Sequence, residues 1–268
     1  ASVPVRPYRR IVAGSLVADH LVALLAERER VVSLGGNALA GATDPQRFAG
    51  FPTFERLNDV EALIALAPDL VVVNNFVHAG AVAQLRNAGL EVFDLGEMHG
   101  LASFVEDARQ LATLIDAPER GERFAAAFEA RMRGVAADIP VSARPRAMYL
   151  GTHGALFFGG TRGTSYHEVL VHGGLLDVAA ERYEGWPAFT SEQILDLDPD
   201  VLVTSAGKGL EICRRAGLDM LRPCRGDGRI IELPMELLVD PGAAMLEAAE
   251  EVRRKVHGSS QAPGMRER

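Results

Sequence analysis

Apolar residues recur at helical spacing through the middle of the chain, between residues 116 and 139. Phe124, Phe128 and Met132 are four positions apart, and charged residues fill most positions between them, so the pattern predicts an amphipathic helix. The acid at the first position can cap this helix, and Pro140 follows its end. About 22 residues at 1.5 Å each would form a rod of roughly 33 Å, which is long enough to hold two lobes apart.

Short apolar runs and amphipathic segments alternate on both sides of this rod, which predicts parallel sheets covered by helices. We therefore expect an α/β protein with two Rossmann-like lobes of mainly parallel sheets joined by one long rigid helix. The expected divisions are an N-terminal lobe at 1–100, helices at 101–139, a C-terminal lobe at 140–258 and a disordered tail at 259–268. Strands are predicted at 11–15, 31–34, 70–73, 91–95, 146–150, 155–158, 201–204 and 229–233, and helices at 17–25, 60–66, 81–88, 101–115, 166–171, 192–197, 210–216 and 241–256.

One unit of sequence occurs once on each side of the rod, at residues 59–73 and 191–203. Each copy has a capping residue, an acid in the first helical turn, a short helix, a Pro-Asp break and an apolar strand. Two such copies favour two lobes of like topology over one continuous sheet. A cleft between two lobes is the default place for a ligand.

Composition and charge exclude several classes of protein. The chain has 48% hydrophobic and 24% charged residues, which is typical of a folded domain, and its formal net charge of −8 argues against nucleic-acid binding. No apolar run reaches the roughly 18 residues of a membrane span, and the start of the chain lacks the features of a signal peptide. Cys213 and Cys224 could form one disulfide or remain two buried thiols.

Several polar and aromatic residues follow predicted strands, where a parallel sheet directs its loops toward a ligand. His153 stands out among the histidines because small residues flank it, although it could equally be an ordinary surface histidine, as could His78 and His99. Asn37, Asn74, Asn75 and Phe76 could supply hydrogen bonds and an apolar wall from the first lobe, or serve only as turn residues.

Two aromatic residues are candidates in the second lobe. Trp186, the single tryptophan, could line a ligand site or simply pack on the lobe, and Tyr166 could contact a ligand or belong to the core. The glycines at 159–163 lack the Gly-Lys-Ser/Thr of a phosphate loop, and no serine lies in G-x-S-x-G. These absences leave nucleotide-binding and hydrolase functions without support.

With these features the chain resembles the class III periplasmic substrate-binding proteins of ABC importers, which carry cobalamin, haem and ferric siderophores. The resemblance covers residues 10–256 and rests on the paired units, the segment 163–174 and the run Glu184-Gly185-Trp186-Pro187. It implies ligand held between two lobes, an aromatic residue at position 186 against that ligand, and one glutamate per lobe that docks to permease arginines. The matching glutamates are Glu61 and Glu192, which could otherwise serve only to compensate helix dipoles.

The resemblance leads us to expect a monomeric, periplasmic or membrane-tethered carrier that does no chemistry and has ABC permease subunits and a small-molecule ligand as partners. No resident cofactor is expected, and the metal centre of a haem ligand would meet His153 or Tyr166. The loop after Gly36 lacks the tyrosine often found in cobalamin and haem binders, and no arginine cluster appears, which favours a largely neutral ligand. We expect a corrinoid first, haem second and a ferric siderophore third. The alternatives are a chelatase-like enzyme that uses His153 or His99, and a carrier-derived sensor.

Overall fold

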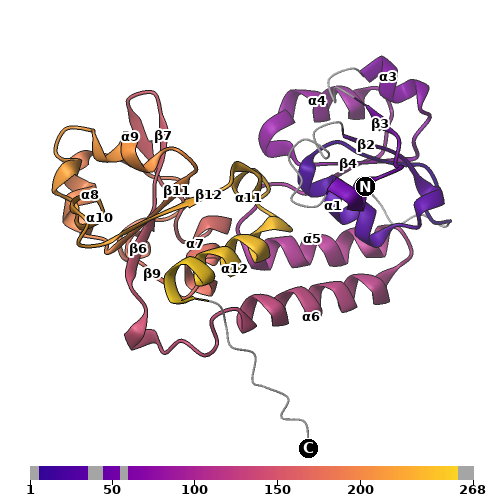
Figure 1. The fold of residues 1–268 in the computed structure, drawn as a ribbon. Helices are drawn as coiled ribbons and strands as arrows, with labels where there is room; N and C mark the ends of the chain where they lie inside the picture. The colour runs from indigo at the N-terminus through magenta and orange to yellow at the C-terminus, as the bar shows by residue number, and fades with distance from the viewer. Residues whose placement is uncertain (1–5, 36–44, 55–59, 259–268) are drawn as a thin grey trace, which may run out of the picture. The chain divides into compact units, whose positions relative to one another are not determined.

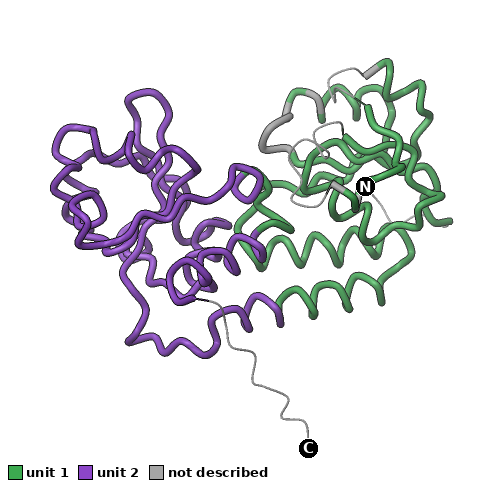
Figure 2. The backbone as a smooth tube through the Cα atoms, in the orientation of Figure 1, with its two compact units in different colours: residues 1–129, 239–244 green, residues 130–238, 245–268 purple. Residues whose placement is uncertain are grey.

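The computed structural model describes residues 6–35, 45–54 and 60–258 of the 268-residue chain. The chain forms two compact units, of which unit 1 comprises residues 1–129 and 239–244 and unit 2 comprises residues 130–238 and 245–268 (Figure 2). The backbone therefore passes from one unit to the other three times, after residues 129, 238 and 244. The divisions expected at residues 100 and 139 did not include the short return to unit 1 at 239–244.

Unit 1 contains a five-stranded parallel sheet in the order β3-β2-β1-β4-β5 (Figure 1). Its central strands are almost fully apolar and buried, as expected for a sheet covered on both faces. Valines of the strands pack in the core against leucines of α3 and α4. The elements are β1 Ile11–Ala13, α1 Leu16–Leu25, β2 Val31–Gly35, β3 Thr53–Phe54, α3 Val60–Ala65, β4 Leu70–Val73, α4 Asn75–Asn87, β5 Val92–Asp94 and α5 Leu101–Leu114, with 3-10 turns at Arg28–Arg30 and Pro45–Phe48.

Unit 2 contains a four-stranded parallel sheet, β12-β11-β6-β9, and a small antiparallel sheet, β10-β8-β7. The parallel strands are β6 Arg146–Tyr149, β9 Leu176–Asp177, β11 Val201–Ser205 and β12 Arg229–Leu233, and the antiparallel ones are β7 Gly151–His153, β8 Leu156–Phe158 and β10 Ala188–Phe189. The helices are α7 Ser165–His172, α8 Ser191–Leu197, α9 Gly209–Cys213, α10 Arg222–Arg225, α11 Met235–Val239 and α12 Ala244–His257, with 3-10 turns at Val141–Ala143, Ala179–Glu181 and Leu218–Met220.

Helix α6, Pro118–Gly134, is the expected rod, but it is shorter than predicted. Asp116 has a positive φ of 59° and so lies outside the helix, and only single turns follow Gly134. The apolar stripe is confirmed, because Phe128 and Met132 are buried. Helices α5 and α6 run side by side (Figure 1), and a Cβ at Gly121 would lie 2.4 Å from the Ala112 Cβ, so glycine permits this close approach.

The expected α/β class with parallel sheets in two lobes is confirmed, and the exceptions are local. Helix α4 begins at Asn75, directly after β4, rather than at residue 81. Strands β3, β7, β9 and β10 were not predicted, because two or three residues carry too little periodicity to be recognised. Cys213 and Cys224 form a disulfide with a Cα–Cα distance of 5.3 Å that links α9 to α10. In the described part of the chain, no helix has the length and apolar character needed to span a membrane.

Candidate functional site

The strand order of unit 2 points to one edge of its sheet as the place for a ligand. From β6 the chain proceeds outward to β9, and from β11 it proceeds outward to β12, so the direction of winding reverses between β6 and β11. Ligands of open α/β sheets bind outside the carboxyl ends of strands at such a switch point. The residues at these ends are Tyr149 of β6 and Ser205 of β11.

Three aromatic side chains gather beside the end of β6. The rings of Tyr149 and Tyr166 stack with centroids 3.9 Å apart, and Trp186 meets Tyr166 edge-on at 5.1 Å. Tyr149 is buried and Tyr166 is half-buried, whereas Trp186 keeps 41% of its surface exposed. The cluster therefore presents an indole to solvent on a base of two phenol rings. We call Tyr149, Tyr166 and Trp186 the aromatic cluster.

The backbone around Trp186 holds the indole in place. The Gly159 N–H donates to the Pro187 carbonyl at 2.9 Å, and the Thr161 N–H donates to the Gly185 carbonyl at 3.1 Å, which extends the pairing of β8 with β10. Gly160 lies against both rings, because a Cβ there would be 2.7 Å from Tyr166 and 3.0 Å from Trp186. The glycine run at 159–163 thus permits aromatic packing rather than forming a phosphate loop.

Tyr166 lies in the first turn of α7, whose start is capped by the Thr164 hydroxyl. Its own hydroxyl donates to the Leu238 carbonyl oxygen at 3.0 Å. Burial raises the pKa of Tyr166 well above its ordinary value, and the neighbouring Tyr149 raises it further. A tyrosine that ligates iron does so as the phenolate, so this environment favours a stacking role for Tyr166 over metal ligation.

Two of the three candidate histidines, His153 and His99, are exposed and lie outside the helices. His153 ends β7 at the tip of the β7–β8 hairpin, where Gly154 adopts a φ of 58° and its carbonyl accepts a hydrogen bond from Arg215. His99 is exposed just before α5, and its backbone N–H donates to the Ser103 hydroxyl at 2.8 Å.

In unit 1 the corresponding switch point lies between β1 and β4, because the order β3-β2-β1-β4-β5 reverses there. Asn74 follows β4 and is buried at this point, and Asn75 and Phe76 begin α4 immediately after it. The side chains of Asn75 and Phe76 lie outside what the structure describes, as do the whole of Asn37 and the side chain of His78. The backbone of Asn75 and Phe76 directly follows β4, and a ligand-binding role for these residues stays a prediction.

The two glutamates of the repeated unit occupy matching places. Glu61 is exposed in the first turn of α3, and Glu192 is exposed in the first turn of α8. Thr190, rather than the expected Ser191, caps α8, and its hydroxyl and the Gln193 side chain complete a capping box. Hydrogen bonds from its own backbone N–H and from Thr190 hold the pKa of Glu192 below its ordinary value. Glu192 is therefore an ionised, solvent-facing acid at neutral pH.

Sequence reasoning missed two buried polar groups. In unit 2 the Asp177 carboxylate lies 2.8 Å from Nδ1 of His167 and accepts a hydrogen bond from the Thr161 hydroxyl at 2.6 Å. In unit 1, His20 and Asp240 form a buried pair. The partners are 10 and 220 positions apart in sequence, and no local pattern signals them. Among the described residues, no group of three or more His, Cys, Asp or Glu side chains could hold a metal ion.

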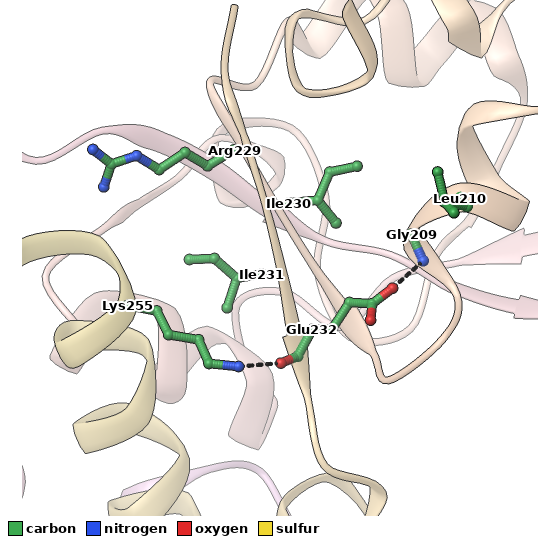
Figure 3. A pocket seen from close by; sticks show the side chains of 7 residues that line it. All are labelled: Gly209, Leu210, Arg229, Ile230, Ile231, Glu232 and Lys255. Carbon is green, nitrogen blue, oxygen red and sulfur yellow. Dashed lines mark hydrogen bonds between the residues drawn. The ribbon is translucent and has the colours of Figure 1, made fainter. Parts of the chain in front are cut away.

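A shallow groove of about 580 Å³ lies along β12, the edge strand of the unit 2 sheet (Figure 3). The Glu232 carboxylate accepts the Gly209 N–H at 2.8 Å, and the Lys255 ammonium donates to the Glu232 carbonyl at 2.6 Å. A lysine that donates a hydrogen bond to a carbonyl of an edge strand hinders the pairing of a further strand there. The groove therefore follows a sheet edge that is protected against strand addition. The aromatic cluster remains the better candidate for a ligand-binding site.

Comparison with known proteins identifies the family of the chain. The periplasmic binding protein family model matches residues 49–258. The vitamin B12-binding protein of Salmonella choleraesuis is 27% identical over 172 residues, which are 64% of this chain and 63% of that protein. The cobalamin-binding protein of Halobacterium salinarum is 29% identical over 187 residues, which are 67% of this chain and 49% of that protein. The chain thus spans between about half and two thirds of the length of these relatives.

Solved structures show the same fold. A possible iron-binding (periplasmic solute-binding) protein of Staphylococcus epidermidis has a TM-score of 0.79 and 16% identity, covering 94% of this chain and 100% of that one. A periplasmic heme-binding protein of Roseiflexus has a TM-score of 0.69 and 24% identity, covering 91% of this chain and 98% of that one. The resemblance to class III substrate-binding proteins is thereby confirmed: the chain belongs to the periplasmic binding protein family.

Proposed function

We propose that this protein is the substrate-binding component of an ABC importer and captures a metal chelate, which is a corrinoid, haem or a ferric siderophore. The observation that carries the proposal is the aromatic cluster at the end of β6, where Trp186 is 41% exposed on a base of two tyrosines. A planar, partly apolar ligand gains both hydrophobic burial and ring stacking on such a surface. The relatives named for vitamin B12 and cobalamin, and the structural neighbour named for heme, support this ligand class.

The ligand order follows from the chemistry of the cluster. The aromatic cluster carries no formal charge, and the raised pKa of Tyr166 disfavours the phenolate that would ligate haem iron. A corrinoid, whose cobalt already carries its own ligands, needs shape and stacking more than a protein ligand. We therefore place a corrinoid first, haem second and a ferric siderophore third.

The partners and location belong to the same proposal. Glu61 and Glu192 would dock to arginines of the permease, because each is an exposed acid at a matching place in its unit. The protein would act as a monomer outside the cytoplasm, where the oxidising environment suits the Cys213–Cys224 disulfide. It would do no chemistry on its ligand.

The test is a titration of the purified protein with cyanocobalamin, haemin and a ferric siderophore. Trp186 is the single tryptophan, so its fluorescence reports directly on the aromatic cluster, while absorbance reports on the chelate. We expect saturable quenching by one of the three and recovery of the ligand unchanged. Release of free metal or of an altered macrocycle would instead support the chelatase-like enzyme. Failure of all three ligands to bind would refute the proposal.

A further inference from the structure

Unit 2 contains a buried carboxylate that the proposed function does not use. Asp177, the last residue of β9, has a side chain that is 1% exposed. Its Oδ2 accepts the Thr161 hydroxyl at 2.6 Å and lies 2.8 Å from Nδ1 of His167, while its Oδ1 accepts the Ala179 N–H at 3.1 Å. Burying a carboxylate is costly unless such partners are present. Asp177 therefore fixes two segments of unit 2, one at residue 161 and one at the start of α7.

The contact with Thr161 holds the backbone beside the indole of Trp186. Thr161 is buried. Its N–H donates to the Gly185 carbonyl at 3.1 Å, and the Gly185 N–H donates to the Arg162 carbonyl at 2.9 Å. Gly185 directly precedes Trp186 in the chain. The Thr161 side chain is thus attached to Asp177, while the Thr161 backbone holds the segment that carries the indole.

The contact with His167 holds the helix that carries the second ring of the aromatic cluster. His167 directly follows Tyr166 in the first turn of α7, and its backbone N–H donates to the capping Thr164 hydroxyl at 3.4 Å. That hydroxyl in turn donates to the Thr161 carbonyl at 2.8 Å. The start of α7 and residue 161 are therefore tied to each other and to the same carboxylate. Tyr166 and Trp186 share one buried anchor.

We propose that Asp177 is a positioning residue for the aromatic cluster, because it fixes the backbone beside Tyr166 and Trp186 and so holds both rings in one arrangement before a ligand arrives. A preformed surface loses less side-chain freedom on binding than a mobile one, so it binds more tightly without any added contact. Asp177 itself does not touch the ligand, since its side chain is buried. The effect on affinity rests on the proposed function, whereas the positioning of the indole does not.

The first experiment measures the order of the indole in the ligand-free protein. Removing Asp177 would leave buried donors without an acceptor and would endanger folding, so the variant is Thr161→Val, which keeps the side-chain shape and removes only the hydroxyl. Trp186 is the single tryptophan, so time-resolved fluorescence anisotropy reports the motion of this indole alone. We expect a lower anisotropy and, by NMR, about three- to tenfold faster hydrogen exchange of the Gly185 amide. If either value stays at that of the wild type, Asp177 does not position the indole.

Two further variants separate positioning from a general loss of packing. Thr161→Ser restores the hydroxyl without the methyl group, so it should return both measured values to within about twofold of the wild type. Thr204→Val removes another buried threonine hydroxyl of unit 2, which lies in β11 and has no hydrogen-bond partner among the described residues. This control should behave like the wild type. Loosening by either variant equal to that by Thr161→Val would refute positioning through the hydrogen bond.

The second experiment titrates the same variants with cyanocobalamin and with haemin, followed by absorbance. Whichever probe binds the wild type should bind Thr161→Val about three- to tenfold more weakly, because a mobile indole has to be ordered on binding, and Thr161→Ser should recover the affinity. Equal affinity of Thr161→Val and the wild type for a bound probe would refute the effect on binding. If neither probe binds, the proposed function fails, and the ligand-free experiment still decides whether Asp177 positions the indole.

Discussion

Replacing Trp186 by alanine tests the role of the aromatic cluster most directly. The side chain is 41% exposed. For a tryptophan of about 250 Å², that fraction is roughly 100 Å² of surface available to a ligand. At about 25 cal/mol per Å², full coverage contributes about 2.5 kcal/mol, which corresponds to up to about a 60-fold weaker affinity in Trp186→Ala. Trp186→Phe should lose less, because a phenyl ring can still stack on the ligand.

The assay has to avoid the fluorescence signal that the substitution removes. Calorimetry and absorbance titration with cyanocobalamin and haemin give the dissociation constants of both variants and of the wild type. Met220→Ala is the control, since Met220 is also an apolar residue of unit 2, is 59% exposed, and lies in a 3-10 turn rather than at a strand end. Circular dichroism confirms that each variant is folded. An affinity of Trp186→Ala within twofold of the wild type would refute a stacking role for the indole.

Three further predictions follow. The Cys213–Cys224 disulfide closes a loop over a sequence separation of 11, so replacing both residues by serine should lower the free energy of unfolding by about 3 kcal/mol in chemical denaturation, and an unchanged midpoint would refute this. Burial raises the pKa of Asp107 to about 7. Between about pH 4 and 7 the folded protein therefore keeps a proton on Asp107 that the unfolded chain releases, so the free energy of unfolding falls as the pH rises through this range. Asp107→Asn should therefore stabilise the protein by about 1–2 kcal/mol at pH 8, after allowance for partial exposure, and by almost nothing at pH 4; equal effects at both values would contradict this. Reversing Glu61 and Glu192 to arginine should leave ligand affinity unchanged and should strongly reduce transport by the reconstituted importer, with each single reversal weaker; normal transport by the double variant would exclude docking.

The regular elements of this protein could be predicted from sequence because their signals are local. Strand β4 and strand β12 have the predicted bounds, and the buried positions Phe128 and Met132 follow from helical spacing alone. The repeated unit placed Glu61 and Glu192 in matching first turns, as the structure shows. A periodic apolar face has to be buried against another element in almost any fold, so hydrophobic burial enforces it whatever the topology.

The contacts that define the candidate site were decided only by the tertiary structure. Trp186 was identified from the family resemblance, but its base of Tyr149 and Tyr166 depends on the pairing of β8 with β10, strands too short to carry a periodic signal. The pairing of His20 with Asp240 joins residues 220 positions apart in sequence. Such pairs form because the fold brings distant segments together and a buried charge then requires a partner. Sequence periodicity records which face of an element is buried, whereas only the assembled sheets determine which distant side chains meet there.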